Sequence, residues 1–419
     1  MAESGVVANV CRDTPVCAPQ LGQTRASAPA SAGQQISGLA ALAFGHTVCD
    51  FYATFLTPLL PLLLVRFKLS TFMGSLLVAA VAISGSTLQP VIGAIGGAGR
   101  SKGAIVVGMF MMAVFFSCLG FAPNLPTLFA ILLVGALGCS LFHPHAASIA
   151  TRISSGRRGM AMSLFTVAGT AGIFMSPKIV PRIVTMSPEW GLKALVLTMP
   201  LGLVCAVVLA LLTPMAPPET TRRERTEWRG LVSGDVPGLA TLVVSAILYS
   251  LTICGLCTFL PLMLCGERNY SLTQAGDMLS WLILAGAVGV VLGGYLSDRI
   301  GRWRVIMGAY LLSVPLFSGF LAANGVLAQI LLMAGGVALW SAQPCTITLA
   351  QELVPHAARI ASGMVMGFAW GMAGLFLPIF GLIADRAGTS YAMRWIVLLP
   401  IGAAVSLCVM KRYARSEWV

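Results

Sequence analysis

Twelve apolar runs of 19 to 30 residues are the feature that most limits how this chain can fold. A hydrocarbon core of about 30 Å needs about 20 apolar residues in a helix, and lipid offers no partner for free backbone groups. Each run is therefore predicted to be a membrane-spanning helix, which makes the chain an all-α membrane protein. We expect the spans at 36–65, 73–95, 103–121, 127–151, 159–184, 192–213, 236–265, 273–297, 303–322, 326–351, 359–384 and 391–411.

The composition indicates the same class of protein. Hydrophobic residues make up 57% of the 419 residues and charged residues only 10%, whereas a soluble domain is about 25% charged. This balance excludes an ordinary soluble enzyme, a disordered chain and a coiled coil. The net charge of +12 comes from Lys and Arg in short loops between the runs. We therefore expect the lipid bilayer as a partner, and no nucleic acid.

The placement of Lys and Arg predicts the orientation, because positive residues stay in the cytoplasm. With a cytoplasmic amino terminus, 18 of the 26 basic residues fall on the cytoplasmic side and 8 on the other side. We expect both termini in the cytoplasm and the chain in the inner (plasma) membrane. The first 35 residues are rich in Ala, Ser, Pro and Gln and have no apolar core, which indicates a disordered tail and not a signal peptide.

An internal repeat of about 200 residues predicts two similar halves. Two parallel six-helix halves are typical of a transporter that rocks one half against the other around a site near the bilayer midplane. The matching pairs, with offsets of 200, 201, 200 and 201, are Pro61 and Pro261, Gly93 and Gly294, Pro144 and Pro344, and Pro177 and Pro378. The predicted segments are a tail at 1–35, a first bundle at 36–213, a cytoplasmic linker at 214–235, a second bundle at 236–413 and a tail at 414–419.

The stretch GGYLSDRIGRWRV, from Gly293 to Val305, resembles the loop signature of the major facilitator superfamily. The resemblance implies the major facilitator fold of twelve helices. A carboxylate at a helix end can pair with a neighbouring helix terminus in one rocking state. We expect such a cytoplasmic latch from Gly294, Asp298, Arg299, Gly301 and Arg302. The matching loop of the first half has Gly97 where the acid is expected.

Two further stretches resemble the fosmidomycin-resistance type within that superfamily. They are GHTVCDFYATFLTPLLPLLL from Gly45 and SLFHPHAASIATRISSGRRGMAMSLF from Ser140. This likeness implies a proton-driven exporter of a small anionic or drug-like molecule. The chain departs from the pattern at His145, where an acid is usual, and at Thr166, where Gln is common.

His46 and Asp50 are the first candidates for proton coupling or for the substrate cavity. They are four residues apart, hence on one face of a helix. A charged residue at the centre of a span costs about 2.5 to 3.5 kcal/mol on insertion scales, so it is expected to face a wet cavity or a partner. A buried structural pair is the alternative interpretation.

The fourth span adds His143 and His145, which flank Pro144. Proline frees a backbone carbonyl and permits a kink. Residues two apart point about 200° away from each other on a helix, so only one of these histidines can face the central cavity well. The resemblance favours His143. Its counterpart in the tenth span, Gln343, is uncharged, which assigns titration to the first half.

Lys178 and Arg182 lie one turn apart near the outer end of the fifth span. They are candidate contacts for an anion that leaves outward. Snorkelling of the two long side chains toward the lipid headgroups is the alternative.

Other functions remain open at the level of sequence. Twenty methionines and the pair Cys254 and Cys257 suggest a soft-metal (copper) transporter, and a siderophore transporter or a receptor-like homologue that does not transport are further alternatives. No phosphate-binding loop is present. We expect no enzyme activity, no cofactor and no metal site, and a monomer that binds a small-molecule substrate and protons.

Overall fold

The computed structural model describes residues 32–89, 92, 101–154, 158–214 and 235–413. Ten helices in these ranges are long and apolar enough to cross a membrane. The second and third predicted spans coincide with shorter apolar helices, Thr71–Thr87 and Ser101–Ser117. The twelve predicted runs are therefore all helical where they are described, and the prediction of an all-α membrane fold is confirmed.

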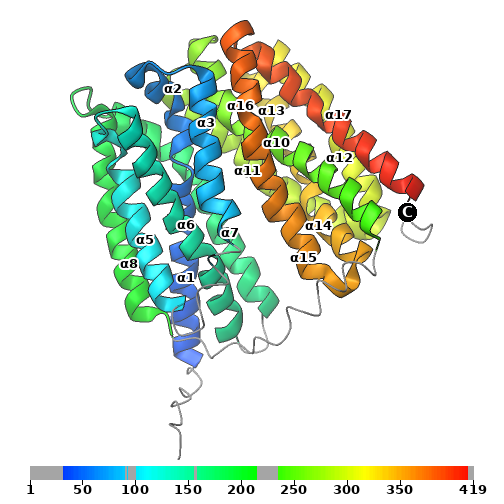
Figure 1. Cartoon of the computed structure of the whole chain (residues 1–419), viewed down its shortest axis with the longest axis horizontal. Helices are drawn as coiled ribbons and strands as arrows, with labels where there is room; N and C mark the ends of the chain where they lie inside the picture. The colour runs from blue at the N-terminus through cyan, green and yellow to red at the C-terminus, as the bar shows by residue number, and fades with distance from the viewer. Residues whose placement is uncertain (1–31, 90–91, 93–100, 155–157, 215–234, 414–419) are drawn as a thin grey trace, which may run out of the picture.

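The helices before residue 214 form the left part of Figure 1. Side-chain caps explain where two of these helices begin. The Ser70 side chain accepts a hydrogen bond from the Met73 amide at 3.2 Å, and the Asn124 side chain accepts one from the Thr127 amide at 3.0 Å. The elements are α1 (Ala32–Ala53), α2 (Leu56–Phe67), α3 (Thr71–Ala82), the π-helical segment η1 (Ile83–Thr87), α5 (Ser101–Ser117), the 3₁₀ segment η3 (Leu119–Phe121), α6 (Leu125–Ile153), α7 (Arg158–Thr185), the 3₁₀ segment η4 (Gly191–Thr198) and α8 (Met199–Leu212).

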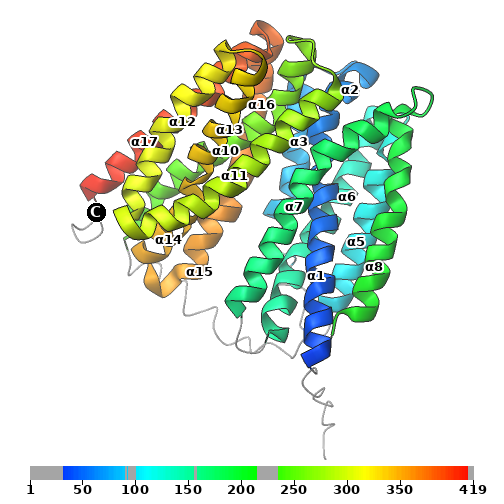
Figure 2. The same cartoon turned by 180° about the vertical axis from the view of Figure 1, so that it is seen from behind.

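The helices after residue 234 form the other part of the molecule (Figures 1 and 2). Ser271 and Gln274 close a capping box at the start of α11. The elements are α10 (Val236–Gly266), α11 (Leu272–Ile300), α12 (Arg302–Ala322), α13 (Gly325–Trp340), α14 (Ala342–Leu353), the 3₁₀ segment η5 (Pro355–Ala357), α15 (Ala358–Gly363), the π-helical segment η6 (Met364–Phe368), α16 (Ala369–Ala387) and α17 (Thr389–Tyr413).

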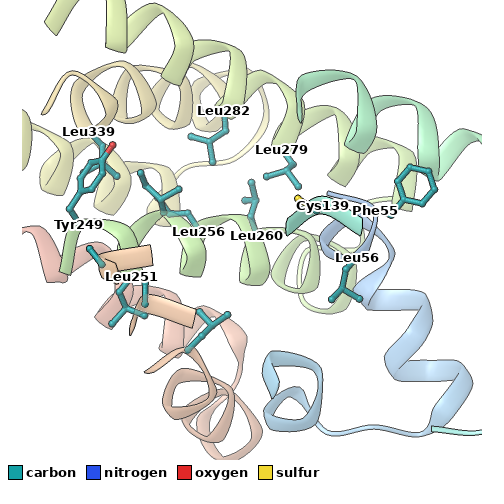
Figure 3. Packing of buried hydrophobic residues seen from close by; sticks show 14 of the residues in the cluster. Phe55, Leu56, Cys139, Tyr249, Leu251, Leu256, Leu260, Leu279, Leu282 and Leu339 are labelled. Atoms are coloured by element: carbon teal, nitrogen blue, oxygen red, sulfur yellow. The ribbon is translucent and has the colours of Figure 1, made fainter. Parts of the chain in front are cut away.

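Apolar side chains fill the space between these helices. Leu256 and Leu260 of α10 lie beside Leu282 and Leu279 of α11 (Figure 3), and all four are buried. Between the two parts of the molecule, α3 packs against α16 (Figure 1) and α7 against α11 (Figure 2). Together with α2, which packs against α10, these helix pairs form the contact between the two parts.

The two ends of the molecule differ. At one end, called the linker end, α8 finishes and α10 begins. Gly38 of α1 lies against Pro214 there, and the Asp235 amide donates to the Leu353 carbonyl at 3.0 Å. The opposite end, called the far end, is where α3 and α11 begin (Figures 1 and 2). Most of the predicted tail 1–35, the linker 214–235 and the tail 414–419 lie outside the described residues, as does Gly97.

Candidate proton and substrate site

The structure brings His46, Asp50 and His143 together near the middle of the first span. Asp50 Oδ2 lies 3.3 Å from His46 Nε2, and Asp50 Oδ1 lies 3.0 Å from His143 Nε2. His46 and Asp50 are each 8% exposed. The α-helical spacing of α1 places His46 below Asp50, while α6 supplies His143 from the neighbouring helix. One carboxylate thus bridges two imidazoles.

Hydrogen bonding determines where His46 carries its hydrogen. Its Nδ1 lies 2.7 Å from the carbonyl oxygen of Phe165. A carbonyl oxygen only accepts, so Nδ1 is the donor, and in a neutral ring Nε2 then bears a lone pair. That lone pair would face Asp50 Oδ2. Because two acceptors repel, the contact requires a proton on either Nε2 or the carboxyl group.

His143 has more freedom than His46. Its Nδ1 lies 3.2 Å from both the carbonyl oxygen and the thiol sulfur of Cys139. The carbonyl only accepts, whereas the thiol can also donate, so His143 can hold its hydrogen on either nitrogen. An imidazole that can carry its hydrogen on either Nδ1 or Nε2 is able to pass a proton to or from Asp50.

The cluster depends on close packing from α7. The ring of Phe165 stacks on His46 with centroids 3.9 Å apart. A Cβ at Gly169 would lie 2.5 Å from His46 Cε1 and 2.6 Å from Asp50 Oδ2. Only glycine leaves room for the cluster at this point. Sequence reasoning did not assign Phe165, Gly169 or Cys139 to this site, because nothing local in the sequence indicates which helix packs on α1.

This region contains two sets of three possible metal ligands. Within each set, the donor atoms lie within 4.8 Å of one another, a spacing at which a metal ion could be held. One set is His46, Asp50 and His143, and the other is Cys49, Cys139 and His143. The donor atoms of both sets already contact one another or the backbone: Asp50 contacts both imidazoles, and His143 Nδ1 lies 3.2 Å from the Cys139 carbonyl oxygen. We therefore interpret the cluster as a hydrogen-bonded one. Among the described residues, no such set includes Cys254 or Cys257.

The two remaining candidates of the fourth and tenth spans lie apart from Asp50. His145 is 4% exposed, and its Nδ1 donates to the Leu141 carbonyl at 2.9 Å. Gln343 lies on α14 and is half-buried. Its amide makes no hydrogen bond to the residues that the structure describes. Gln343 therefore belongs to a second, uncharged region of the molecule.

Lys178 and Arg182 both pair with a carboxylate of the opposite half. Asp277, near the start of α11, lies 2.8 Å and 2.9 Å from the two terminal nitrogens of Arg182 and 3.4 Å from Lys178 Nζ. Lys178 also lies over the ring of Trp281 at 5.1 Å. In this state the two cations, which the sequence suggested as anion contacts, are balanced by Asp277. The sequence does contain a signal for Asp277, because an acidic residue inside a predicted membrane span needs a partner.

A second contact joins α3 and α16 at the far end. Both carboxylate oxygens of Asp385 accept from α3, at 2.6 Å from the Thr71 amide and 3.0 Å from the Phe72 amide. These amides belong to the first turn of α3, which has no partner of its own and is electropositive. Asp277 and Asp385 together hold the two halves against each other at the far end.

The predicted latch lies at the linker end. Gly301, with φ of 89°, makes the turn between α11 and α12. Arg302 pairs with Glu352 at 2.8 Å, and Arg299 lies over the ring of Tyr295 at 4.4 Å. Asp298 is exposed and has no ion pair or hydrogen bond with any described residue. The carboxylate of the latch is therefore free to pair in another arrangement of the halves.

Comparisons with known proteins also indicate a membrane transporter. The model of the Major Facilitator Superfamily matches residues 42–378. The fosmidomycin resistance protein of Escherichia coli (strain K12) is 29% identical over 377 residues, which are 87% of this chain and 90% of that protein. The uncharacterized MFS-type transporter YfnC of Bacillus subtilis (strain 168) is 28% identical over 343 residues, or 80% and 83% of the two chains.

A solved structure has a similar course of the backbone. The crystal structure of a bacterial homologue of the human lysosomal transporter Spinster, in an inward-facing and unoccupied conformation, matches with a TM-score of 0.75. The two proteins are 16% identical, and the match covers 92% of this chain and 98% of the other. At that identity the likeness shows a common fold alone.

Proposed function

We propose that this chain, which belongs to the Major Facilitator Superfamily, exports a small anionic or drug-like molecule in exchange for protons. Membership makes it a multi-pass membrane protein and a secondary transporter of small molecules, and not an enzyme. The proposed substrate class is supported by the relative named for fosmidomycin resistance, at 29% identity.

The contact of His46 with Asp50 is the observation that carries the proposed coupling. With His46 Nδ1 held by the Phe165 carbonyl, the 3.3 Å approach of Nε2 to the carboxylate needs one proton between them. Burial disfavours the ionised carboxylate, whereas a neighbouring imidazolium favours it. A change in burial as the halves rock would therefore change how firmly this proton is held.

In the proposed cycle, Asp50 takes up a proton from outside and releases it inward as the substrate leaves. His46 and His143 bias the protonation of Asp50. The membrane potential contributes about 2.3 kcal/mol per charge per 100 mV, which is enough to drive a useful gradient when each cycle moves one net charge. The contacts made by Asp277 and Asp385 would have to open before the site is exposed at the far end.

The organisation that goes with this cycle consists of two moving bundles, 36–213 and 236–413, joined by a cytoplasmic linker at 214–235. Both termini are then cytoplasmic, the linker end faces the cytoplasm, and the chain lies in the inner (plasma) membrane as a monomer. The excess of Lys and Arg in alternate loops supports this orientation.

Asp50→Asn tests the coupling directly. In inside-out vesicles with a proton gradient, the wild type is expected to accumulate fosmidomycin, and Asp50→Asn is expected to lose that accumulation. The variant should keep downhill exchange of labelled for unlabelled fosmidomycin, because the amide preserves shape but cannot release a proton. The matched control, Glu189→Gln, neutralises an exposed acid outside the cluster. Gradient-driven accumulation by Asp50→Asn would show that Asp50 is structural.

A further inference from the structure

Two thiols lie beside the proton cluster, on the side of His143 that faces away from Asp50. Cys49 of α1 and Cys139 of α6 place their sulfur atoms 3.8 Å and 3.2 Å from His143 Nδ1. The two sulfur atoms and this nitrogen lie within 4.8 Å of one another. The other ring nitrogen, Nε2, contacts Asp50. His143 therefore stands between a carboxylate and a pair of thiols.

The distances to the thiols are close to those of a metal site. A tetrahedral Zn²⁺ ion with Zn–S bonds of about 2.3 Å and a Zn–N bond of about 2.0 Å holds sulfur and nitrogen about 3.5 Å apart. The two sulfur–nitrogen distances differ from that value by about 0.3 Å each. The packing of α1 against α6 thus already holds the three donor atoms near the spacing that an ion requires.

Asp50 gives His143 the support that metal-bound histidines usually have. A histidine that binds a metal through one ring nitrogen almost always donates its other ring N–H to a carboxylate, a backbone carbonyl or water. His143 Nε2 lies 3.0 Å from Asp50 Oδ1, so an ion on Nδ1 would complete this arrangement. The contact is independent of the positions of the sulfur atoms, and it indicates the same site.

The charge of the ligands selects the ion. Two thiolates carry two negative charges, which one divalent cation neutralises, whereas Cu(I) would leave a net negative charge in the membrane interior beside Asp50. Thiolates favour Zn²⁺ and the chemically similar Cd²⁺ over Mg²⁺ and Ca²⁺, which bind oxygen ligands. The other set of ligands, His46, Asp50 and His143, has one carboxylate and would leave a positive charge uncompensated.

We propose that Cys49, Cys139 and His143 bind one thiophilic divalent cation, Zn²⁺ or Cd²⁺, and that the bound ion stops gradient-driven transport. On binding, two S–H bonds break, two metal–sulfur bonds and one metal–nitrogen bond form, and two protons leave to the solvent. With the ion on Nδ1, His143 carries its hydrogen on Nε2 and no longer exchanges it between two nitrogens. The binding site does not depend on the proposed function, whereas the block of transport rests on it.

The exposure of the ligands gives the ion a route. The side chain of His143 is 22% exposed, Cys139 is 6% exposed and Cys49 is fully enclosed. We therefore expect the ion to reach His143 and Cys139 first and Cys49 last.

A titration of the purified full chain with Cd²⁺, without a proton gradient, tests the binding site. The ultraviolet charge-transfer absorption of Cd–thiolate bonds reports binding, and a pH-indicator dye counts the protons. For the wild type we expect one tightly bound Cd²⁺ and the release of two protons per ion. Cys49→Ala and Cys139→Ser each remove a sulfur ligand. Each should weaken binding at least about 100-fold, since even the loss of a group that only supports a ligand costs about 10- to 100-fold.

The matched control is the double variant Cys254→Ala and Cys257→Ala, which removes two thiols one turn apart on α10. Among the described residues this pair belongs to no set of three metal ligands, so binding should be unchanged. Absence of tight binding to the wild type would overturn the inference, and so would binding that survives in both Cys49→Ala and Cys139→Ser. Loss of binding in the control would place the ion on α10 and overturn the inference as well.

Transport of fosmidomycin in inside-out vesicles, with and without Cd²⁺, tests the block. We expect Cd²⁺ to abolish accumulation by the wild type and by the control, and a chelator to restore it. Cys49→Ala and Cys139→Ser should each keep, in Cd²⁺, the rate that they have without it. A bound ion that leaves wild-type transport unchanged would overturn the block. A wild type that binds Cd²⁺ as expected but accumulates nothing even without the ion would instead refute the proposed function and leave the binding site assigned.

Discussion

The two halves place different side chains on matching backbone positions. Pro144 and Pro344 follow His143 and Gln343, yet of these last two residues only His143 has a side chain that can take up a proton. Asp50 has a bridging role between two imidazoles, whereas its counterpart, Ser250, is buried with a hydroxyl that has no partner among the described residues. At matching positions, the first half thus has His46, Asp50 and His143, and the second half has Ala246, Ser250 and Gln343.

The division has a physical reason. A charged residue at mid-membrane costs about 2.5 to 3.5 kcal/mol on insertion scales, so one cluster of charges is easier to maintain than two. In the first half, Asp50 meets that cost through two imidazole contacts at 3.0 and 3.3 Å. The second half avoids the cost, and its uncharged surface remains available for contacts that do not change with protonation.

Gly169→Ala is expected to have the largest effect on this comparison. The added Cβ would lie 2.5 Å from His46 Cε1, so the imidazole and the carboxylate must separate. Overpacking of this kind costs about 1 to 3 kcal/mol of stability, and a misplacement of about 1 Å lowers a chemical step by about 100-fold. Gradient-driven transport in vesicles and the melting temperature measure the two effects.

Gly159→Ala is the matched control on the same helix, because a Cβ there meets nothing within 4 Å. It should leave transport unchanged. Normal gradient-driven transport by Gly169→Ala would mean that the cluster tolerates displacement and that His46 and Asp50 need not touch.

His143→Gln places in the first half the side chain that the second half has at the matching position, Gln343. Asp50 then keeps a hydrogen-bond donor but loses a group that can take up its proton. A hydrogen bond from a charged donor is about twice as strong as one from a neutral amide, a difference of about 1 to 2 kcal/mol, so we expect gradient-driven transport to fall about 5- to 30-fold while exchange persists. The rate of gradient-driven uptake at several pH values measures this.

The reciprocal variant, Gln343→His, sharpens the same test. It should add no proton to the cycle, because position 250 holds a serine and not an acid. A changed number of protons per substrate in Gln343→His would show that the second half can couple as well, and the division between the halves would be wrong.

The sequence predicted the helices well because about 20 apolar residues in a row leave lipid as their main solvent. It also found His46 and Asp50, whose spacing of four residues is a local signal. It could not place His143 against Asp50, 93 residues away, or identify Gly169 as the position that admits the cluster. Those relations depend on which helices pack together, and periodicity within one helix does not encode that.

Asp277→Asn tests the contact between the halves at the far end and should have a moderate effect. Arg182 and Lys178 would lose their carboxylate, and Arg182 is 46% exposed in its side chain, so solvent screening limits the loss to about 1 kcal/mol. We expect a shift of roughly fivefold away from the arrangement described here. Distances between spin labels on the far ends of α7 and α11 report the populations.

Asp385→Asn is the comparison for this prediction, since an amide oxygen can still accept from the Thr71 amide. It should shift the populations less than Asp277→Asn does. An equal or larger shift would mean that the contact of α3 with α16, and not the ion pair, controls the far end.

Asp298→Asn is expected to have the smallest effect. It tests the difference between the latch loop of the second half and the matching loop of the first half. The first half has Gly97 where the second has an acid, so the proposed latch has a carboxylate in the second half alone. In the arrangement described here Asp298 is exposed and has no ion pair with any described residue, and its contribution must therefore arise in another state. A carboxylate that pairs with the N-terminus of a neighbouring helix contributes about 0.3 to 1 kcal/mol, which predicts turnover slowed about twofold to fivefold with substrate affinity unchanged. Gly97→Asp should be tolerated and should favour one state. Parallel measurement of exchange rate and equilibrium binding separates the two quantities, and a variant Asp298→Asn that binds substrate poorly but cycles at the normal rate would place this residue in binding and not in the latch.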